Sequence, residues 1–255
     1  MRISGVIITL DEERNLGRCL ESLRGVADEV VVVDSGSRDG TERIARAGGA
    51  VFVRQPWLGY GPQKNAAVER ASSEWVLSLD ADEALSDELR ASLLEVKAQG
   101  PQADAYEMNR RNWYCGRFLR HSGWYPDRKI RLWRKGAARW SDATIHEVAA
   151  AAPGARVGWL SGDLLHYTCH TREQHLRTIE RFTTLSAEAL AREGRTAGAW
   201  KRLASPAAHF LRAYVLQRGF LDGAAGFQAC RLSAYATWLK YDKLRRLTRA
   251  TRAGA

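Results

Sequence analysis

The chain has few of the features that mark membrane-spanning, exported or zinc-binding proteins. Its 255 residues contain no run of even ten residues free of Asp, Glu, Lys and Arg, whereas a membrane-spanning helix needs about 20 mostly apolar residues. The four cysteines form no CxxC pair, so neither a zinc site nor a disulfide framework is indicated. The opening MRISGVIITLDEE turns acidic after a short apolar run, unlike a secretory signal. We therefore expect a cytoplasmic protein that does not span a bilayer.

Familiar nucleotide-binding motifs are missing too. No GxGxxG follows the first apolar run, which argues against a dinucleotide-binding dehydrogenase, and the GxxxxGK[ST] motif of P-loop ATPases is absent. A pyrophosphorylase that makes a sugar nucleotide is expected to carry a Gly-rich loop with Lys or Arg after its first strand. The segment LDEERNLGR at that place provides no such loop.

The excess positive charge lies at one end of the chain. The formal net charge is +10. Residues 1–104 carry 12 Lys and Arg against 18 Asp and Glu, and residues 105–170 carry 11 against 5, so these two segments cancel. Residues 171–255 carry 16 against 6, which equals the whole net charge. This distribution predicts a nearly neutral globular body followed by a basic C-terminal region.

Strand and helix patterns alternate over residues 1–104. A β-branched run over residues 2–9 is followed by Leu16, Leu20 and Leu23, which share one helix face, and the run EVVVVD opens a second strand and helix. Strands made of continuous Val, Ile and Leu are buried on both faces, which is typical of a parallel sheet with crossover helices. We predict an α/β fold with a mostly parallel, Rossmann-like nucleotide-binding sheet.

The rest of the chain follows two further patterns. Residues 104–110 and 129–134 are predicted strands that flank an irregular aromatic loop. Beyond residue 170, apolar side chains recur at three- and four-residue spacing with Arg and Lys between them, which predicts amphipathic helices. The expected breaks between these helices are Gly194, Gly198, Pro206 and residues 219–226.

Acidic side chains follow the predicted strands at the edge of the sheet where ligands bind. Asp34 ends one apolar run, and Asp80 and Asp82 follow another, WVLSL. Carboxylates two residues apart on an extended backbone point the same way, which suits Mg²⁺ or Mn²⁺, cations that prefer oxygen ligands. A purely structural role, in which these acids solvate the strand end and cap a helix near Ser86, explains the same pattern.

Four segments in order, IITLDEERNL, VVVDSGSRDGT, GYGPQKNAA and LSLDADE, closely resemble the family 2 glycosyltransferases of the GT-A fold. Further on, GWYPDRKIRLWRKG, TIHE, LLHYTCHT and GFLDGAAG are similar to the branch of lipopolysaccharide inner-core β-1,4-glucosyltransferases, so the resemblance covers nearly the whole chain. It implies a donor-binding half over residues 1–104 and an acceptor and catalytic half of the same domain over residues 105–170. Residues 171–255 form the basic amphipathic helical region.

The resemblance also implies roles for single residues on the donor side. They are Thr9, Asp11 and Glu12 beside the nucleotide, Asp34 at the base, Lys64 near the base and phosphates, Asp80 and Asp82 at the metal and diphosphate, and His166 or His146 as a further metal or phosphate contact. The implied cofactor is Mg²⁺ or Mn²⁺. Alternative readings make Asp34 a turn-forming residue of DSGS, Lys64 a solvated helix residue and the histidines packing residues.

The reaction itself requires neutralisation of charge and removal of a proton. An acceptor hydroxyl attacks the anomeric carbon while a nucleoside diphosphate leaves, so cations from the basic segment, Arg128 and Arg131, are expected to assist the metal. A carboxylate acting as general base typically contributes about 100- to 10,000-fold. Glu147 in TIHE is the first candidate and Asp142 the second, against the alternative that Glu147 is an ordinary exposed acid.

Two further regions are expected to meet the acceptor. Trp124 and Tyr125 can stack on sugar rings, although most tryptophans serve core packing. The basic helical tail is expected to contact an anionic membrane surface or the phosphates of a lipid-linked acceptor. The alternative is that its charges only form a solvated face.

Together these observations predict an inverting, metal-dependent glycosyltransferase. The expected donor is UDP-glucose, and the expected acceptor is an inner-core heptose of lipopolysaccharide or a similar lipid-linked saccharide at the inner face of the cell membrane. One alternative is a nucleic-acid-binding protein, since residues 110–139 carry ten Lys and Arg interleaved with aromatic residues. No recognised nucleic-acid motif accompanies them, so no nucleic acid partner is expected. The other alternative is a sugar-nucleotide pyrophosphorylase.

Overall fold

The chain folds into two compact units. The computed structural model describes residues 1–142 and 147–253, with side chains described up to residue 249. The first unit consists of Met1–Arg111 and Asp127–Tyr167, and the second of Asn112–Pro126 and the chain from Thr168 onward. Each unit is thus assembled from separate segments of sequence. The assignment of donor, acceptor and tail regions to residues 1–104, 105–170 and 171–255 remains a prediction.

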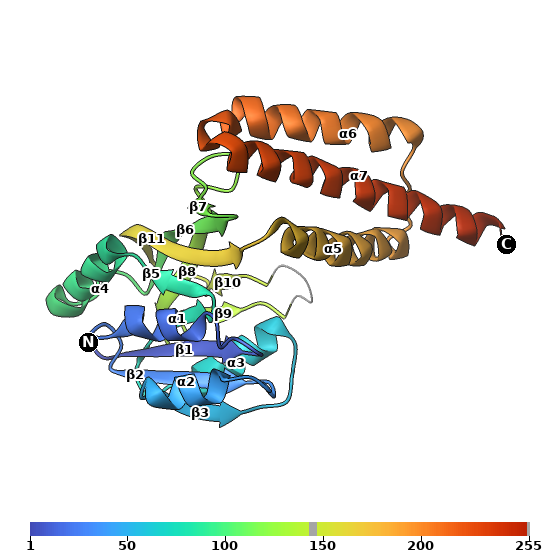
Figure 1. Ribbon diagram of the computed structural model, residues 1–255. Helices are drawn as coiled ribbons and strands as arrows, with labels where there is room; N and C mark the ends of the chain where they lie inside the picture. The colour runs from blue at the N-terminus through green and yellow to red at the C-terminus, as the bar shows by residue number, and fades with distance from the viewer. Residues whose placement is uncertain (143–146, 254–255) are drawn as a thin grey trace. The chain divides into compact units, whose positions relative to one another are not determined.

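The first unit contains the predicted parallel sheet. Its strands β1 (Ile3–Thr9), β2 (Glu29–Asp34), β3 (Val51–Arg54) and β4 (Trp75–Asp80) run parallel in the order β3-β2-β1-β4 (Figure 1). The helices between them are α1 (Leu16–Leu23), α2 (Thr41–Ala47) and α3 (Tyr60–Arg70). Val6 of β1 pairs with Val31 on one side and with Ser78 on the other. The predicted α/β fold is therefore confirmed, and the carboxyl ends of β1, β2 and β4 meet at one edge.

Antiparallel strands extend this sheet beyond β4. Among the described residues the order continues β4-β8-β6-β11-β5, with β7 paired to β6, while β9 and β10 form a separate pair. The bounds are β5 (Glu83–Leu85), α4 (Asp87–Gln99), β6 (Ala105–Tyr114), β7 (Arg117–Phe118), β8 (Arg128–Arg134), β9 (Ala138–Trp140), β10 (Ala149–Ala151) and β11 (Val157–Cys169). Both predicted strands are present. β6 runs further than predicted, into the aromatic loop, because Trp113 pairs with Phe118 of β7.

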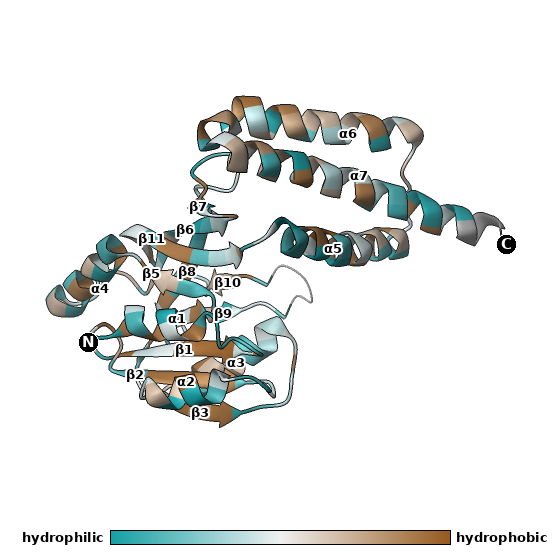
Figure 2. Ribbon diagram, viewed as in Figure 1, coloured by the Kyte–Doolittle hydropathy of each residue, from teal (hydrophilic) through white to brown (hydrophobic). Residues whose placement is uncertain are grey.

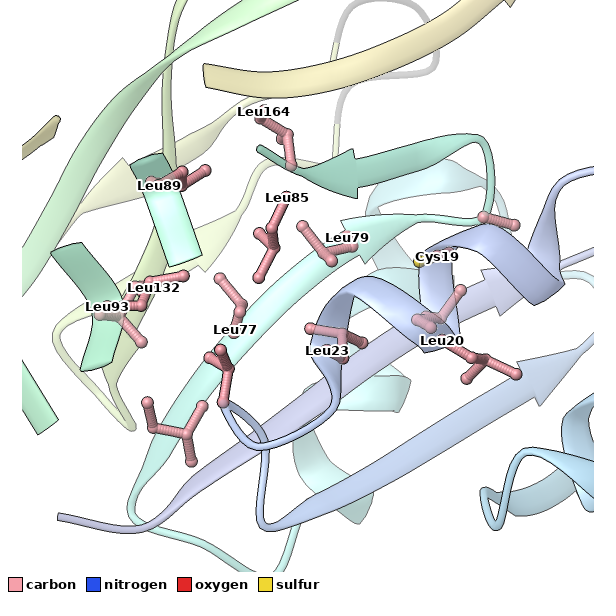
Figure 3. Packing of buried hydrophobic residues seen from close by; sticks show 14 of the residues in the cluster. Cys19, Leu20, Leu23, Leu77, Leu79, Leu85, Leu89, Leu93, Leu132 and Leu164 are labelled. Atoms are coloured by element: carbon pink, nitrogen blue, oxygen red, sulfur yellow. The ribbon is translucent and has the colours of Figure 1, made fainter. Parts of the chain in front are cut away.

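The core of the first unit lies beneath α1. Leu16, Leu20 and Leu23, at the predicted helical spacing, are all buried. They belong to one cluster with Leu77 and Leu79 of β4 and with leucines of β5 and α4 (Figure 3). Because burial of a leucine side chain contributes about 1.5–3 kcal/mol, this cluster anchors β4, which carries the acidic motif, to the rest of the unit.

The second unit is mostly helical, as the sequence predicts. Its elements are α5 (Arg172–Arg192), α6 (Ala199–Leu211), a π-helical turn η1 (Arg212–Leu216), a 3-10 turn η2 (Gly219–Asp222) and α7 (Gly223–Ala253). The long helix α7 packs along both α5 and α6 (Figure 1). No helix within the described parts of the chain is long and apolar enough to cross a membrane.

The predicted helix break at Pro206 is wrong, because Pro206 lies inside α6. A proline in a helix interior removes one backbone hydrogen bond and crowds the preceding turn. Here the packing of α6 along α7 outweighs that local cost, so the helix continues to Leu211. Of the other predicted breaks, residues 194, 198 and 219–223 fall between or at the ends of helices. The prediction is wrong for residues 224–226, which lie inside α7; glycine is needed at 226 because a Cβ there would be 2.1 Å from the Gly219 carbonyl oxygen.

Candidate active site

The ends of β1 and β2 carry a closed network of hydrogen bonds around Asp34. Its carboxylate, in a residue only 2% exposed, accepts hydrogen bonds from Thr9 Oγ1 at 2.8 Å, from the N–H groups of Gly36 and Ser37 at 2.9 and 2.8 Å, and from Ser37 Oγ. Burial alone raises the pKa of Asp34, but these hydrogen bonds outweigh it and leave the pKa below its usual range. Since a carboxylate has about four acceptor sites, a nucleotide base would have to replace one of these donors. The geometry favours the turn-forming role, and the base contact remains a prediction.

Asp11 and Glu12 join the loop after β1 to the loop after β2. Asp11 Oδ1 accepts a hydrogen bond from the Arg38 N–H at 2.8 Å, and the Glu12 N–H donates to Thr41 Oγ1 at 2.8 Å. Burial raises the pKa of Glu12, and the neighbouring Asp82 carboxylate adds to the rise. Glu12 therefore lies near the acidic motif that follows β4, and the two loops form one edge of the site.

Lys64, from α3, connects two of the predicted acids. Its ammonium group lies 2.7 Å from Asp80 Oδ1 and 2.9 Å from Glu147 Oε1, and 4.2 Å from the centre of the Trp140 ring. The residue is only 4% exposed, so it is not the solvated helix residue of the alternative reading. The helix, the end of β4 and the segment before β10 are thereby brought together.

A second layer of charge lies behind Asp80. Arg131 Nη2 is 3.2 Å from Asp80 Oδ2 and 2.6 Å from Glu83 Oε1, and Glu83 Oε2 accepts a hydrogen bond from the Asp80 N–H at 3.0 Å. Burial on its own raises the pKa of Asp80, but Lys64 and Arg131 lower it well below the usual range. We call Lys64, Asp80, Glu83, Arg131 and Glu147 the Lys64 cluster. Within it Asp80 is fixed as a charged acceptor between two cations.

Asp82 and His166 form the part of the site that fits a divalent cation. Asp82 Oδ2 lies 3.2 Å from His166 Nε2, and both side chains are partly exposed. Among the residues that the structure describes, no group of three or more His, Cys, Asp and Glu is arranged to hold a metal by itself. Mg²⁺ typically takes one or two carboxylates and completes its shell with water and substrate phosphates. The Asp82–His166 pair therefore fits such an ion together with a diphosphate, whereas Asp80 is already held by cations.

A close backbone approach holds the segment after β9 against α3. A Cβ atom on Gly61 would lie 1.8 Å from the carbonyl oxygen of Ser141, so only glycine permits this contact. Asn65 reinforces it, because its side chain donates to the Trp140 carbonyl at 3.0 Å and accepts from the Trp140 N–H at 3.1 Å. These contacts hold Ser141 alongside α3, and the Ser141 N–H donates to the carbonyl of Val148, the neighbour of Glu147, at 2.9 Å.

The two candidate bases have different surroundings. The Glu147 side chain is 18% exposed and is oriented by Lys64, whereas Asp142 is exposed. Glu147 is therefore the candidate that the structure brings together with Asp80. His146, the other histidine considered for a metal or phosphate contact, lies outside the described residues.

Three of the predicted residues make other contacts. Arg128 has a side chain 65% exposed, and its guanidinium lies 3.3 Å from Glu107. Trp124 and Tyr125 belong to the second unit, where Trp124 packs edge-on against Tyr114 with ring centroids 5.6 Å apart. Among the described contacts, Arg128 does not join the Lys64 cluster. The roles of all three residues remain predictions.

Sequence reasoning missed Glu83 and Asn65. The Glu83 side chain is fully buried in β5, which pairs with β11, and it holds both the Asp80 backbone and Arg131. The position of Glu83 directly after Asp82 could have drawn attention to it. Its burial could not be predicted, because a three-residue strand leaves no clear pattern in the sequence. No local signal marks Asn65, because its partner Trp140 is 75 residues away along the chain.

An α/β sheet whose parallel strands carry acids and cations at their carboxyl ends has the Rossmann-like arrangement, in which ligands bind at that edge. The family is shown by comparison, since residues 4–162 match the model of glycosyl transferase family 2. The chain belongs to this family and is a glycosyltransferase.

Relatives of known sequence align along nearly the whole chain. It is 32% identical to the lipopolysaccharide core biosynthesis glycosyltransferase LpsC of Rhizobium meliloti, over 95% of this chain and 91% of that protein. It is 30% identical to an uncharacterised glycosyltransferase of Rickettsia typhi, over 98% of this chain and 89% of that protein. The mannosyltransferase PcManGT of Pyrobaculum calidifontis, solved with GDP-mannose and Mn²⁺, has a TM-score of 0.53 at 17% identity, over 95% of this chain and 86% of that chain. That likeness concerns the GT-A fold, which this chain shares.

Proposed function

We propose that the chain transfers a sugar, glucose from UDP-glucose in the first instance, to an inner-core heptose of lipopolysaccharide or a similar lipid-linked saccharide. The observation that carries the proposal is the Asp82–His166 pair, two residues along from Asp80 in the Lys64 cluster. This pair supports the proposal because a cation at Asp82 and His166 would lie at the carboxyl end of β4, where a sugar-nucleotide diphosphate needs positive charge.

Different residues contribute to stabilising the leaving group. A Mg²⁺ or Mn²⁺ ion held by Asp82 and His166 would supply positive charge to the departing diphosphate. Lys64 and Arg131 are buried and paired with acids, so their role is to hold the Asp80 carboxylate in place before the reaction begins. Thr9, Asp11 and Glu12 border the nucleotide, with Asp34 shaping the loop beneath it.

The acceptor reacts in a single displacement. Its hydroxyl oxygen forms a bond to the anomeric carbon while the bond from that carbon to the diphosphate oxygen breaks, and the configuration inverts. The hydroxyl proton passes to a Glu147 carboxylate oxygen as general base, with Asp142 as the second candidate. Lys64 orients Glu147 at 2.9 Å, which holds one oxygen in place and leaves the other for the hydroxyl.

The acceptor side is proposed from the relatives and the charge. LpsC is named for lipopolysaccharide core biosynthesis, and it matches nearly the whole of this chain. Residues 171–255 carry 16 Lys and Arg against 6 Asp and Glu, which favours contact with acceptor phosphates and with an anionic membrane surface. We place the enzyme on the cytoplasmic side, peripherally bound to the inner face of the cell membrane.

A thermal-shift screen of nucleotide sugars with and without Mn²⁺ tests the donor site. A ligand that binds only the folded state raises the melting temperature by mass action, so UDP-glucose with Mn²⁺ should give a larger shift than either alone. Asp82→Ala should abolish the Mn²⁺-dependent part of the shift and of glucosyl transfer. The matched control Glu69→Ala, at an exposed acid on α3, should behave as the parent chain. Equal activity in Asp82→Ala and the parent would remove the cation role of Asp82.

No observation in the described residues favours either alternative function, nucleic-acid binding or a sugar-nucleotide pyrophosphorylase. Six of the ten cations of residues 110–139 are paired with acids of the first unit, so most of this segment's charge is already neutralised; these six are Arg110, Arg111, Arg128, Lys129, Arg131 and Arg134. Binding of single-stranded RNA with a steep salt slope, unaffected by UDP and Mn²⁺, would support the nucleic-acid reading instead.

A further inference from the structure

Large apolar side chains are exposed together in one part of the second unit. In residues 199–221 Trp200 is 81% exposed, Leu216 77%, Leu203 62% and Leu211 58%. Val215, Phe220 and Leu221 in the same segment are about half exposed. Large exposed apolar residues gathered in this way mark a surface that contacts a partner or a membrane. We call this segment, α6 with η1 and η2, the α6 surface.

Helical geometry explains why these residues share a face. Trp200, Leu203, Ala207 and Leu211 follow one another at spacings of three and four, and all four are exposed. None of the α6 residues is fully buried, although Phe210 and Pro206 are half-buried beside α7. In Figure 2, hydrophobic (brown) and hydrophilic (teal) segments alternate along α6. The helix therefore presents an apolar stripe that α7 leaves exposed, with Leu203 and Ala207 at its margin next to α7.

The charged side chains within this segment are all positive. Residues 199–221 contain Lys201, Arg202, Arg212 and Arg218 and no Asp or Glu. Arg202 is paired with Asp242 of α7 at 2.7 Å, whereas Arg212 and Arg218 are exposed. The next acid, Asp222, is 1% exposed, so it does not offset the positive charge at the surface.

A groove next to the stripe adds to the apolar area. It lies between α6 and α7 and has a volume of about 400 Å³. Leu203, Ala207, Phe210 and Trp238 line it, and Arg231, which is exposed, lies at its margin. An open apolar groove beside a cation has room for part of a lipid acyl chain whose phosphate meets the arginine.

We propose that the α6 surface is the part of the enzyme that inserts into an anionic bilayer. Apolar side chains at this position enter the boundary between headgroups and acyl chains, and the exposed arginines, Arg212 and Arg218, meet lipid phosphates. A protein partner or a second copy of the chain would need acids to face these cations. The inference deepens the proposed function, because it names the surface by which an enzyme with a lipid-linked acceptor would reach the membrane.

Vesicle co-sedimentation of the full chain tests the proposal. The parent should bind vesicles of phosphatidylcholine with about one-third phosphatidylglycerol more tightly than phosphatidylcholine alone. A triple variant, Trp200→Ser with Leu203→Ser and Leu216→Ser, should lose at least about tenfold in binding to both vesicle types. Arg212→Gln with Arg218→Gln should lose about 30-fold on anionic vesicles only, and this loss should shrink in high salt.

Controls separate this proposal from a folding defect and from failure of the proposed function. Leu94→Ser with Val157→Ser removes exposed apolar residues of the first unit and should leave vesicle binding unchanged. Every variant should keep the thermal shift produced by UDP-glucose with Mn²⁺. If that shift is absent in the parent chain, the donor proposal fails while vesicle binding still tests the surface. Vesicle binding unchanged in the triple variant, or a dimer of the parent that this variant dissociates, would overturn the membrane assignment.

Discussion

Lys64 is the side chain through which the separate parts of the site are connected. Its ammonium group is buried between the carboxylates of Asp80 and Glu147, against the ring of Trp140. A buried ammonium group without partners would be strongly unfavourable, so the two acids stabilise Lys64 as much as it orients them. The partial exposure of both acids reduces the energy of each pair, but it also leaves them accessible to a substrate.

Glu147→Gln separates catalysis from binding at the scale of one residue. The amide keeps the size of the side chain and a hydrogen-bonding oxygen but takes up a proton poorly, so kcat should fall by about 100-fold or more. The affinity for UDP-glucose, measured by calorimetry with Mn²⁺, should change by less than about threefold, because Lys64 still has Asp80. Asp142→Asn is the matched control and should keep most of the activity. Normal turnover in Glu147→Gln with loss in Asp142→Asn would transfer the role of base to Asp142.

The positions of some site residues could be predicted from the sequence, whereas the contacts of others could not. Asp80 and Asp82 end an apolar run, so their position at the sheet edge follows from the strand pattern alone. Glu83 and Arg131 are 48 residues apart, and their ion pair depends on β8 lying beside β4, which no local pattern reveals. Asp34 was placed at the right edge, yet its four hydrogen-bond donors depend on the loop conformation around Ser37.

Among the elements, α3 and the segment after β9 approach each other at Gly61. A Cβ there would collide with the Ser141 carbonyl oxygen, so Gly61→Ala should push this segment away from α3. We expect a fall in melting temperature of about 4 °C or more and a loss of transfer activity, because Glu147 would move from Lys64. Gly17→Ala, also in a helix, is the control: its Cβ would come no closer than 3.8 Å to Ile44, and the better helix former should not destabilise the chain. Equal melting temperatures for the two variants would contradict the close contact.

The elements that sequence predicted best are those with a strong local pattern. The parallel strands are continuous Val, Ile and Leu runs, and α1 has leucines on one face, so both follow from burial. Pro206 argued for a helix end, but packing against α7 carries α6 through it. The extension of β6 to Tyr114 depends on pairing with β7. In both cases a long-range contact overrides a local preference.

At the scale of the whole molecule, the cations that contribute to the net charge of +10 lie in two kinds of surroundings. In the first unit, several cations of residues 105–139 are neutralised by buried or half-buried acids such as Glu83 and Asp127. On the α6 surface, by contrast, Arg212 and Arg218 are exposed in a segment with no acids. The net charge alone suits nucleic acid and membrane equally. On the α6 surface the exposed cations share a segment with exposed apolar side chains, and this combination favours the membrane.

The paired acids also determine how stability depends on pH. Burial raises the pKa of Asp127, but Arg110 and Lys129 lower it below the usual range, and the pKa of Asp34 is lowered in the same direction by its hydrogen bonds. A carboxyl whose pKa is lower in the folded than in the unfolded state stabilises the fold above its unfolded pKa, near 3.9 for Asp. This contribution disappears as pH falls through the folded value. The contribution of these carboxyls to the free energy of unfolding, measured with urea, should therefore be nearly constant above about pH 5 and decrease below that. Burial lowers the pKa of His175 and of His209, so these histidines should add an earlier decrease that begins near their unfolded pKa of about 6.5.

Asp127→Asn tests the origin of the decrease that the carboxyls produce. The variant should be less stable than the parent near pH 7 by about 1 kcal/mol, because Arg110 and Lys129 lose a charged partner that is itself a quarter exposed. The difference should become smaller as the pH falls below about 4, since the parent's Asp127 is then protonated as well. The exposed acid Glu69, changed to Gln, should give a curve parallel to that of the parent. A constant difference between Asp127→Asn and the parent across the acid range would mean that packing, rather than the ion pairs, accounts for the contribution of Asp127.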